Sequence, residues 1–202
     1  MQDNNYKHKY HKYKMKYLQL NGGKESKIVF ISGISGSGKS TLGKEIATQL
    51  HGKFIDQDWF FVKNKPTIKL SNGKILKNWD HEKALDMKTF NNKLREAKKT
   101  NKYIVVSGFA LRNEWIDHDN KPDIHIHIKV PKELSLQTRL KLKPGNKIDQ
   151  TLMFNEAVLP FYYSTLEKSN IDYFINGTIN DSLERRPKQE MIDEIMGQIN
   201  KL

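Results

Sequence analysis

Short apolar runs alternate along the chain with longer segments in which apolar residues recur every third or fourth position. The runs at 27–32, 54–55, 103–106, 123–130 and 171–175 are typical of buried parallel strands. Helical spacing covers 40–50, 82–99, 132–142, 150–168 and 188–199. This alternation predicts an α/β fold, in which a short five-stranded parallel sheet carries helices on both faces.

One segment departs from the alternation. Residues 67–70 and 74–76 flank Ser71, Asn72 and Gly73, and Asn-Gly between two short alternating runs is a strong hairpin signal. The hairpin is inserted after the second strand, so it is expected to be either a flap over a site or a surface ornament.

Composition adds two constraints. Of 202 residues, 37% are hydrophobic, which is enough for a core, and the absence of Cys excludes disulfides and thiolate chemistry. No apolar window is long enough to span a membrane and no secretory signal is apparent, so a soluble, cytoplasmic protein is expected. Oligomeric state is left open.

The first 24 residues carry +5 of the net charge of +12, and the remaining chain carries +7. Residues 1–24 hold six Lys against one Asp, which gives +5, and alternate Lys and His with Tyr. Such a segment is expected to be a disordered tail preceding a domain over 25–202. Contact of the tail with RNA or an acidic partner stays open, although no nucleic-acid-binding motif accompanies it.

Residues 33–40 match the phosphate-binding motif G-x-x-x-x-G-K-[ST], and the motif lies where it must, between an apolar strand and a helix. Its backbone N–H groups and the helix N-terminus predict a cradle for ATP, with Lys39 on the β- and γ-phosphates and the Ser40 hydroxyl on Mg²⁺. The nucleotide-binding set comprises Gly33, Ser35, Gly36, Ser37, Gly38, Lys39, Ser40 and Thr41.

Two carboxylates follow the second strand and are candidates for the acceptor side of a phosphoryl transfer. Asp56 and Asp58 lie at the carboxyl edge of the predicted sheet, beside the phosphate cradle. Asp58 is expected to take or orient the proton of the acceptor hydroxyl. Asp56 is a candidate ligand of Mg²⁺, or alternatively a helix cap.

Aromatic residues cluster near these acids. Trp59, Phe60 and Phe61 follow Asp58, and Trp79 with Asp80 follows the hairpin. An aromatic ring beside an acid suits a nucleoside, because the ring stacks on the base and the carboxylate accepts from ribose hydroxyls. Core or rim packing of Trp59 and Phe60, and helix capping by Asp80, are the alternatives.

These motifs, in this order, resemble the nicotinamide riboside kinases within the uridine kinase-like group. The likeness spans about 27–200 and rests on these segments: 33–41, 56–61, the hairpin, 78–80, 84–87, 105–109, 159–162 and 176–178. It implies a kinase that phosphorylates the 5′-hydroxyl of nicotinamide riboside, or alternatively of uridine or cytidine. It also implies that Asp58 is catalytic, that Asp80 binds ribose, and that Phe61 and Trp79 enclose the base.

Two positions depart from the family pattern. Ser107 stands where the family has Glu, so a regulator or RNA-associated protein that binds ATP with little kinase activity is a second class to consider. The segment 132–142 is expected to be a lid helix with Arg139 as its phosphate-binding cation. Lys141 and Lys143 accompany Arg139 where the family has further Arg, and Lys grips phosphate less specifically.

Two further features have ordinary interpretations. His125 and His127 share a face of one strand, which permits a metal site but favours a half-exposed strand, since no third ligand is evident. Arg185 and Arg186 before Pro187 are interpreted as a solvated loop, with only a small chance of an ATP contact.

Overall fold

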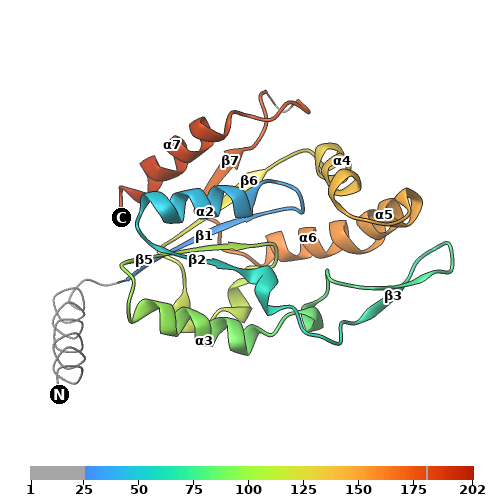
Figure 1. Ribbon diagram of the computed structural model, residues 1–202, viewed down its shortest axis with the longest axis horizontal. Coiled ribbons are helices and arrows are strands. Elements are labelled where there is room, and N and C mark those ends of the chain that lie inside the picture. The colour runs from blue at the N-terminus through green and yellow to red at the C-terminus, as the bar shows by residue number, and fades with distance from the viewer. Residues whose placement is uncertain (1–25, 181) are drawn as a thin grey trace, which may run out of the picture.

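The computed structural model describes residues 26–180 and 182–202, and the tail predicted at 1–24 lies outside this range. Five parallel strands form the sheet of the described residues, in the order β2-β5-β1-β6-β7 (Figure 1). Their bounds are β1 Lys27–Gly33, β2 Lys53–Asp56, β5 Tyr103–Gly108, β6 Ile124–Lys129 and β7 Tyr173–Asn176. The α/β fold with a five-stranded parallel sheet is therefore confirmed.

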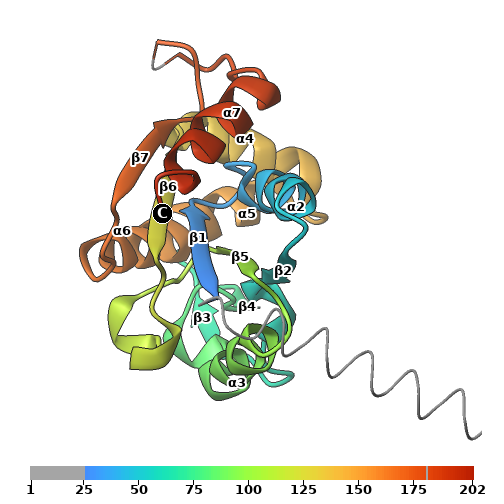
Figure 2. The same cartoon turned by 90° about the vertical axis from the view of Figure 1, so that its left-hand side faces the viewer.

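Helices cover both faces of this sheet, as predicted (Figures 1 and 2). Helices α2 (Lys39–Gln49) and α7 (Lys188–Ile199) pack on one face, against the alternate positions Val29, Ile31 and Ile126. Helix α3 (Met87–Lys98) packs on the other face, against Phe30 and its neighbours. The central strand β1 is apolar on both sides, and it is buried between the two helical layers.

The remaining elements gather beyond the carboxyl ends of the strands (Figure 1). They are the antiparallel hairpin of β3 (Thr67–Lys69) and β4 (Ile75–Lys77), helix α4 (Lys132–Leu142) and helix α5 (Lys147–Met153). Gly73 has φ +83° and makes the predicted Asn-Gly turn possible. In a parallel sheet this edge is where ligands bind, and the hairpin and α4 flank it.

Two predicted helices differ from the structure. The segment 82–99 is a 3-10 turn, Glu82–Ala84, followed by α3, because Asp86 caps α3 by accepting from the Thr89 amide at 2.9 Å. The segment 150–168 starts earlier, at Lys147, and contains the π-helical turn Phe154–Val158 before α6 (Leu159–Glu167). Pro160 lies directly after this turn and has no N–H to donate to it.

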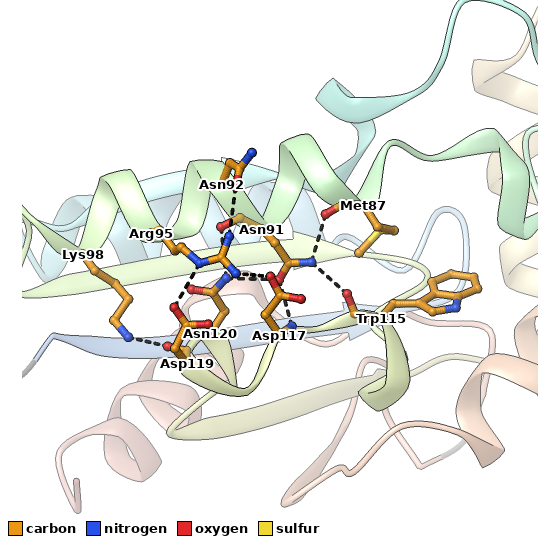
Figure 3. A network of polar contacts seen from close by, with 9 residues as sticks. All are labelled: Met87, Asn91, Asn92, Arg95, Lys98, Trp115, Asp117, Asp119 and Asn120. Atoms are coloured by element: carbon orange, nitrogen blue, oxygen red, sulfur yellow. Dashed lines mark hydrogen bonds and ion pairs between the residues drawn. The ribbon is translucent and has the colours of Figure 1, made fainter.

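A buried amide joins α3 to the connection between β5 and β6 (Figure 3). The Asn91 amide nitrogen donates to the Trp115 carbonyl at 2.9 Å, and its oxygen accepts from the Asp117 N–H at 3.0 Å and from Asn120 Nδ2 at 3.1 Å. Arg95 adds ion pairs to Asp117 and Asp119 on the exposed side. This connection runs from the end of β5 to the start of β6, so the network fixes its course.

A chain of four side chains crosses the sheet interior on the same face as Phe30. Its geometry assigns each proton, because the Asn170 carbonyl can only accept and so requires His125 Nδ1 to donate, at 2.9 Å. His125 Nε2 then accepts from the Ser32 hydroxyl at 2.7 Å, and Ser32 accepts from His127 Nδ1 at 2.9 Å. His127 Nε2 accepts from the Tyr162 hydroxyl at 2.8 Å. With both histidines neutral, every ring nitrogen therefore has a hydrogen-bond partner of the required kind.

The expectation of a half-exposed strand at these histidines is wrong, because His125 and His127 are 2% and 3% exposed. Burial lowers the pKa of His125 to about 4 and of His127 to about 3. No cluster of three or more His, Cys, Asp or Glu suited to a metal occurs in the part of the chain that the structure describes. The pair therefore has a structural explanation: it ties α6 to β1 directly before the phosphate cradle.

Because these two histidines are buried with lowered pKa values, we expect the free energy of unfolding to decrease in acid. A histidine whose folded pKa lies below its unfolded value near 6.5 stabilises the fold above that value, and the stability is lost as the pH falls toward the folded pKa. His127 alone accounts for about 2 kcal/mol of unfolding free energy between pH 7 and pH 5. Urea unfolding of His127→Asn should therefore show a smaller loss between these two pH values than the wild type. An equal loss in wild type and variant would contradict it, and His118→Asn, at an exposed site, is the control.

Candidate active site

The phosphate cradle forms as its motif predicts, between β1 and α2. Gly36 and Gly38 have φ of +79° and +94°, which favours glycine. A Cβ on Gly36 would also lie 3.0 Å from Thr138 of α4, so the loop and α4 pack too closely for a side chain there. Gly38 offers no side-chain cap to α2, and the first N–H groups of the helix therefore face the loop.

Lys39 lies between two hollows in the surface. One, of about 440 Å³, faces the hairpin and is described below. The other, of about 470 Å³, runs along the outer side of the cradle and is bounded by Thr138, Leu142, Arg186 and Met191. Lys39 lines both hollows. The volume and position of each hollow suit one of two reactants that meet at this lysine.

Carboxylates of opposite charge lie around Lys39. Burial lowers the pKa of Lys39, and the carboxylates of Asp58, Asp56 and Asp80 act against that shift. Burial likewise raises the pKa of Asp58, and Lys39 opposes it. The structure therefore brings together Lys39, Asp58 and Asp80, which are distant in the sequence, around the first hollow.

Asp56 is buried at the end of β2 and has the capping role that was one of its two expectations. Its Oδ1 accepts from the Asp58 N–H at 3.1 Å, at the start of the 3-10 turn Gln57–Phe60. Asp56 also pairs in register with Ser107 of β5, whose hydroxyl donates to Ser40 Oγ at 3.2 Å. Hydroxyl and carboxylate oxygens thus converge at the foot of the cradle, a donor set that suits Mg²⁺.

Arg139 enters the first hollow from α4. It is only 8% exposed, and burial lowers the pKa of its guanidinium while Asp80 opposes the shift. Burial also raises the pKa of Asp80, against the charges of Arg139 and Lys143. The lid helix therefore aims a cation at Asp80 across the hollow, and Lys143 adds a second.

Two aromatic pairs form walls of the hollow. Phe61 and Trp79 meet edge to face with their ring centroids 5.0 Å apart, and Lys65 lies 3.8 Å above the Trp79 ring. Phe109 and Phe161 are stacked at 5.8 Å on another part of the lining. Phe61 and Trp79 thus both line the hollow, but the two rings pack on each other and leave no gap for a base between them. Packing of a ligand ring against the outside of this pair stays a prediction.

Three alternatives are decided by the structure. Trp59 is 58% exposed and lies outside the hollow, whereas Phe60 packs on Phe90 in the core at 5.3 Å. Asp80 caps no helix, because His81 and Asp86 cap the two helical segments that follow. Asp80 is therefore left available to the hollow.

Sequence reasoning missed several residues of the site. Arg185 is not in a solvated loop: its Nη2 donates to the Gly36 carbonyl at 2.6 Å and to the Thr138 hydroxyl at 2.9 Å, joining the cradle to α4. Gln57 Nε2 donates to the Ala110 carbonyl at 2.7 Å, and Gln57 Oε1 accepts from the Ala110 N–H at 2.9 Å. Gln150 and Met153 of α5 also line the hollow. The helical spacing over 150–168 predicted an element at Gln150, but no local signal indicated that this element lies beside the hollow.

The hairpin tip is fastened to α5 and the π-helical turn. Glu156 accepts from both the N–H and the hydroxyl of Ser71, at 3.0 and 2.6 Å. Asp149 accepts from Asn72 at 2.9 Å and pairs with Lys74 at 2.6 Å. These contacts form a latch between the hairpin tip and the segment of α5 and the π-helical turn. Leu76 and Lys77 of the hairpin line the hollow, so the hairpin is part of its wall, and its action as a flap stays a prediction.

Comparison with known proteins places the chain among small-molecule kinases. The family model described as shikimate kinase matches residues 35–198. The chain is 28% identical to the thermoresistant gluconokinase of Escherichia coli over 148 residues, which is 72% of this chain and 79% of the relative.

Solved structures of two kinases share the fold. A gluconokinase from Sinorhizobium meliloti has a TM-score of 0.53 and 17% identity, covering 88% of this chain and 94% of its own. A shikimate kinase from Bacteroides thetaiotaomicron has a TM-score of 0.51 and 18% identity, covering 87% and 99%. No helix among the described residues is long and apolar enough to cross a membrane.

The latch predicts the dynamics of the hairpin. Glu156→Ala removes the acceptor of the Ser71 N–H, so hydrogen exchange at the hairpin tip should accelerate about fivefold. The free energy of unfolding should change by about 1 kcal/mol or less, because the contacts are exposed. Hydrogen-exchange mass spectrometry tests this, with Glu167→Ala on α6 as the control. Unchanged exchange at the tip would contradict the latch.

Proposed function

We propose that this chain, which belongs to the shikimate kinase family and is an ATP-dependent kinase of small molecules, acts on a ribonucleoside. The proposed reaction is phosphorylation of the 5′-hydroxyl of that nucleoside. Nicotinamide riboside is the first-choice acceptor, on the resemblance of the sequence motifs, followed by uridine and cytidine. The observation that carries the proposal is the hollow in which Asp58 and Asp80 face an aromatic corner of Phe61 and Trp79.

The nucleotide would occupy the outer hollow, with its phosphates on the cradle. The loop N–H groups and the α2 N-terminus hold the β-phosphate, and Lys39 reaches between the β- and γ-phosphates. Ser40 and Asp56 would hold Mg²⁺, which neutralises phosphate charge when bound. Ser107 in place of a carboxylate contributes a hydroxyl to this group, through its 3.2 Å contact with Ser40.

The transfer itself needs an acceptor hydroxyl in line with the γ-phosphorus. Asp58 accepts the hydroxyl proton as the new oxygen–phosphorus bond forms, and the bond to the bridging oxygen of ADP breaks. Lys39 and Arg139 hold the negative charge that spreads over the transferred group. Asp80 would bind ribose hydroxyls, and the aromatic corner would contact the base.

A sugar acid is the second candidate for the acceptor. The likeness to the Escherichia coli gluconokinase favours it, and so do the cations of Lys77, Arg139 and Lys143 around the same hollow, which could bind a carboxylate. The two candidates differ in what the aromatic corner does: a base would pack on it, whereas a polyol would leave it without an apolar partner.

An acceptor panel tests the proposal. Purified protein with ATP and Mg²⁺ is offered nicotinamide riboside, uridine, cytidine, gluconate and shikimate, and ADP and phosphorylated product are measured. We expect kcat/KM for a nucleoside to exceed that for either acid at least about tenfold, and Lys39→Ala to give no product. A preference for gluconate or shikimate would overturn the nucleoside assignment.

Asp58→Asn tests the acceptor role of this carboxylate. The variant should lose about 100-fold or more in kcat while its affinity for ATP is retained, because the group acts on the acceptor. Burial raises the pKa of Asp58, so the wild-type rate should fall with acid at a pH above the ordinary value of 3.8, and this fall should be absent from the residual activity of the variant. A loss of ATP affinity as large as the loss of rate would contradict the role.

A further inference from the structure

Gln150 is a residue of the hollow to which the phosphoryl transfer described above assigns no part. It lies in the first turns of α5 and lines the hollow beside Lys143, Pro144 and Met153. Its Oε1 atom is buried and has no hydrogen-bond partner within residues 26–180 and 182–202. An acceptor atom that is shielded from water without a partner is costly, so such an atom at the edge of a hollow points to a missing ligand.

The orientation of the amide is fixed by its other end. Gln150 Nε2 donates to the Pro144 carbonyl at 3.2 Å, and a carbonyl oxygen can only accept, so the nitrogen rather than the oxygen must face it. Exchanging the two atoms would place two oxygens against each other. Oε1 is therefore the atom left for a partner, and that partner must carry an O–H or N–H.

The helix that carries Gln150 is held in place from both ends. Asn146 caps α5 by accepting from the Ile148 N–H at 2.8 Å. Asp149, directly before Gln150, is fixed to the hairpin by Asn72 and Lys74. Glu156 secures the π-helical turn to Ser71 in the same way. Gln150 thus has a defined position whenever the hairpin is latched, which is what recognition by a single hydrogen bond requires.

A second unpartnered side-chain atom belongs to the lid helix α4. Arg139 Nε is buried without a hydrogen-bond partner among the described residues, and Arg139 lines the same hollow. One atom can only donate and the other can only accept. The hollow therefore has one unpaired donor and one unpaired acceptor among its lining residues.

We propose that Gln150 is a specificity-determining residue whose Oε1 accepts a hydrogen bond from an O–H or N–H of the acceptor molecule. This inference rests on the proposed function, since it takes the hollow to be the acceptor site. It adds a criterion that the aromatic corner and the two carboxylates do not supply. An acceptor in which the matching donor is replaced by an atom without hydrogen leaves Oε1 unpaired and is disfavoured.

Kinetics with matched acceptors test the proposal. The variants are Gln150→Leu, Gln150→Glu, which keeps an oxygen at this place, and Gln137→Leu, an exposed site on α4, as the control. The acceptors are the best one in the panel and its analogues that each lack one donor: the 2′-deoxy form, the 3′-deoxy form and, for a carboxamide base, the carboxylate form. For an acid acceptor, its deoxy analogues serve instead.

We expect Gln150→Leu to lower kcat/KM about 10- to 100-fold for the full acceptor, with the KM for ATP unchanged. For one donor-lacking analogue the loss should shrink to about twofold or less, and Gln150→Glu should lose less than Gln150→Leu on the full acceptor. Gln137→Leu should match the wild type. A structural role would instead lower kcat/KM equally for every analogue.

Unchanged kcat/KM in Gln150→Leu, or an equal loss for every analogue, would overturn the assignment. The class of the acceptor and the role of Gln150 are tested independently. The wild-type panel decides the class of the acceptor, whereas the ratio of variant to wild type decides Gln150 on whichever acceptor the wild type phosphorylates.

Discussion

The site depends on one constraint, the parallel alignment of β1 with its two neighbours. Because β1 pairs with β5 on one side and β6 on the other, and β2 pairs with β5, the carboxyl ends of these strands meet at one edge. The phosphate cradle leaves β1 there, Ser107 ends β5 there, and Asp56 with Asp58 leaves β2 there. Side chains from distant parts of the sequence therefore share a charge field, in which burial and opposite charge set the pKa of Lys39 and Asp58.

Closure of the hollow depends on contacts of a different kind. The hairpin and α5 are surface elements, and they are held by polar contacts of Ser71 and Lys74 with Glu156 and Asp149 rather than by a shared apolar core. Each such contact is weak in water, so the wall is suited to opening and closing without disturbing the sheet. The inner side is fixed differently, because Tyr162 of α6 is bonded through buried His127 to Ser32 of β1.

The sequence was informative where local chemistry determines local structure. The apolar runs, the Asn-Gly turn and the glycine loop predicted the strands, the hairpin and the phosphate cradle, because each depends on a few adjacent residues. Asp58, Asp80, Phe61, Trp79 and Arg139 were chosen from motifs, and the structure brings them around one hollow. The acceptor itself, and the role of each of these residues, stays a prediction.

The remainder could not be predicted because it depends on distant pairing. Nothing near Arg185 indicates that it reaches the Gly36 carbonyl, and nothing near His127 indicates that Ser32 and Tyr162 are its partners. The π-helical turn and the early start of α5 at Lys147 likewise follow from packing against the hairpin and the cap at Asn146. The position of Gln150 could be recognised only once α5 was placed over the hollow.

The most direct measurement is a crystal structure of the protein with a non-hydrolysable ATP analogue, Mg²⁺ and the acceptor that the enzyme uses best. We expect the triphosphate on residues 33–40, and the acceptor hydroxyl in line with the γ-phosphorus and within hydrogen-bond distance of the Asp58 carboxylate. An acceptor bound away from the hollow between Lys39 and Asp80, or an Asp58 side chain turned away from the γ-phosphate, would contradict it.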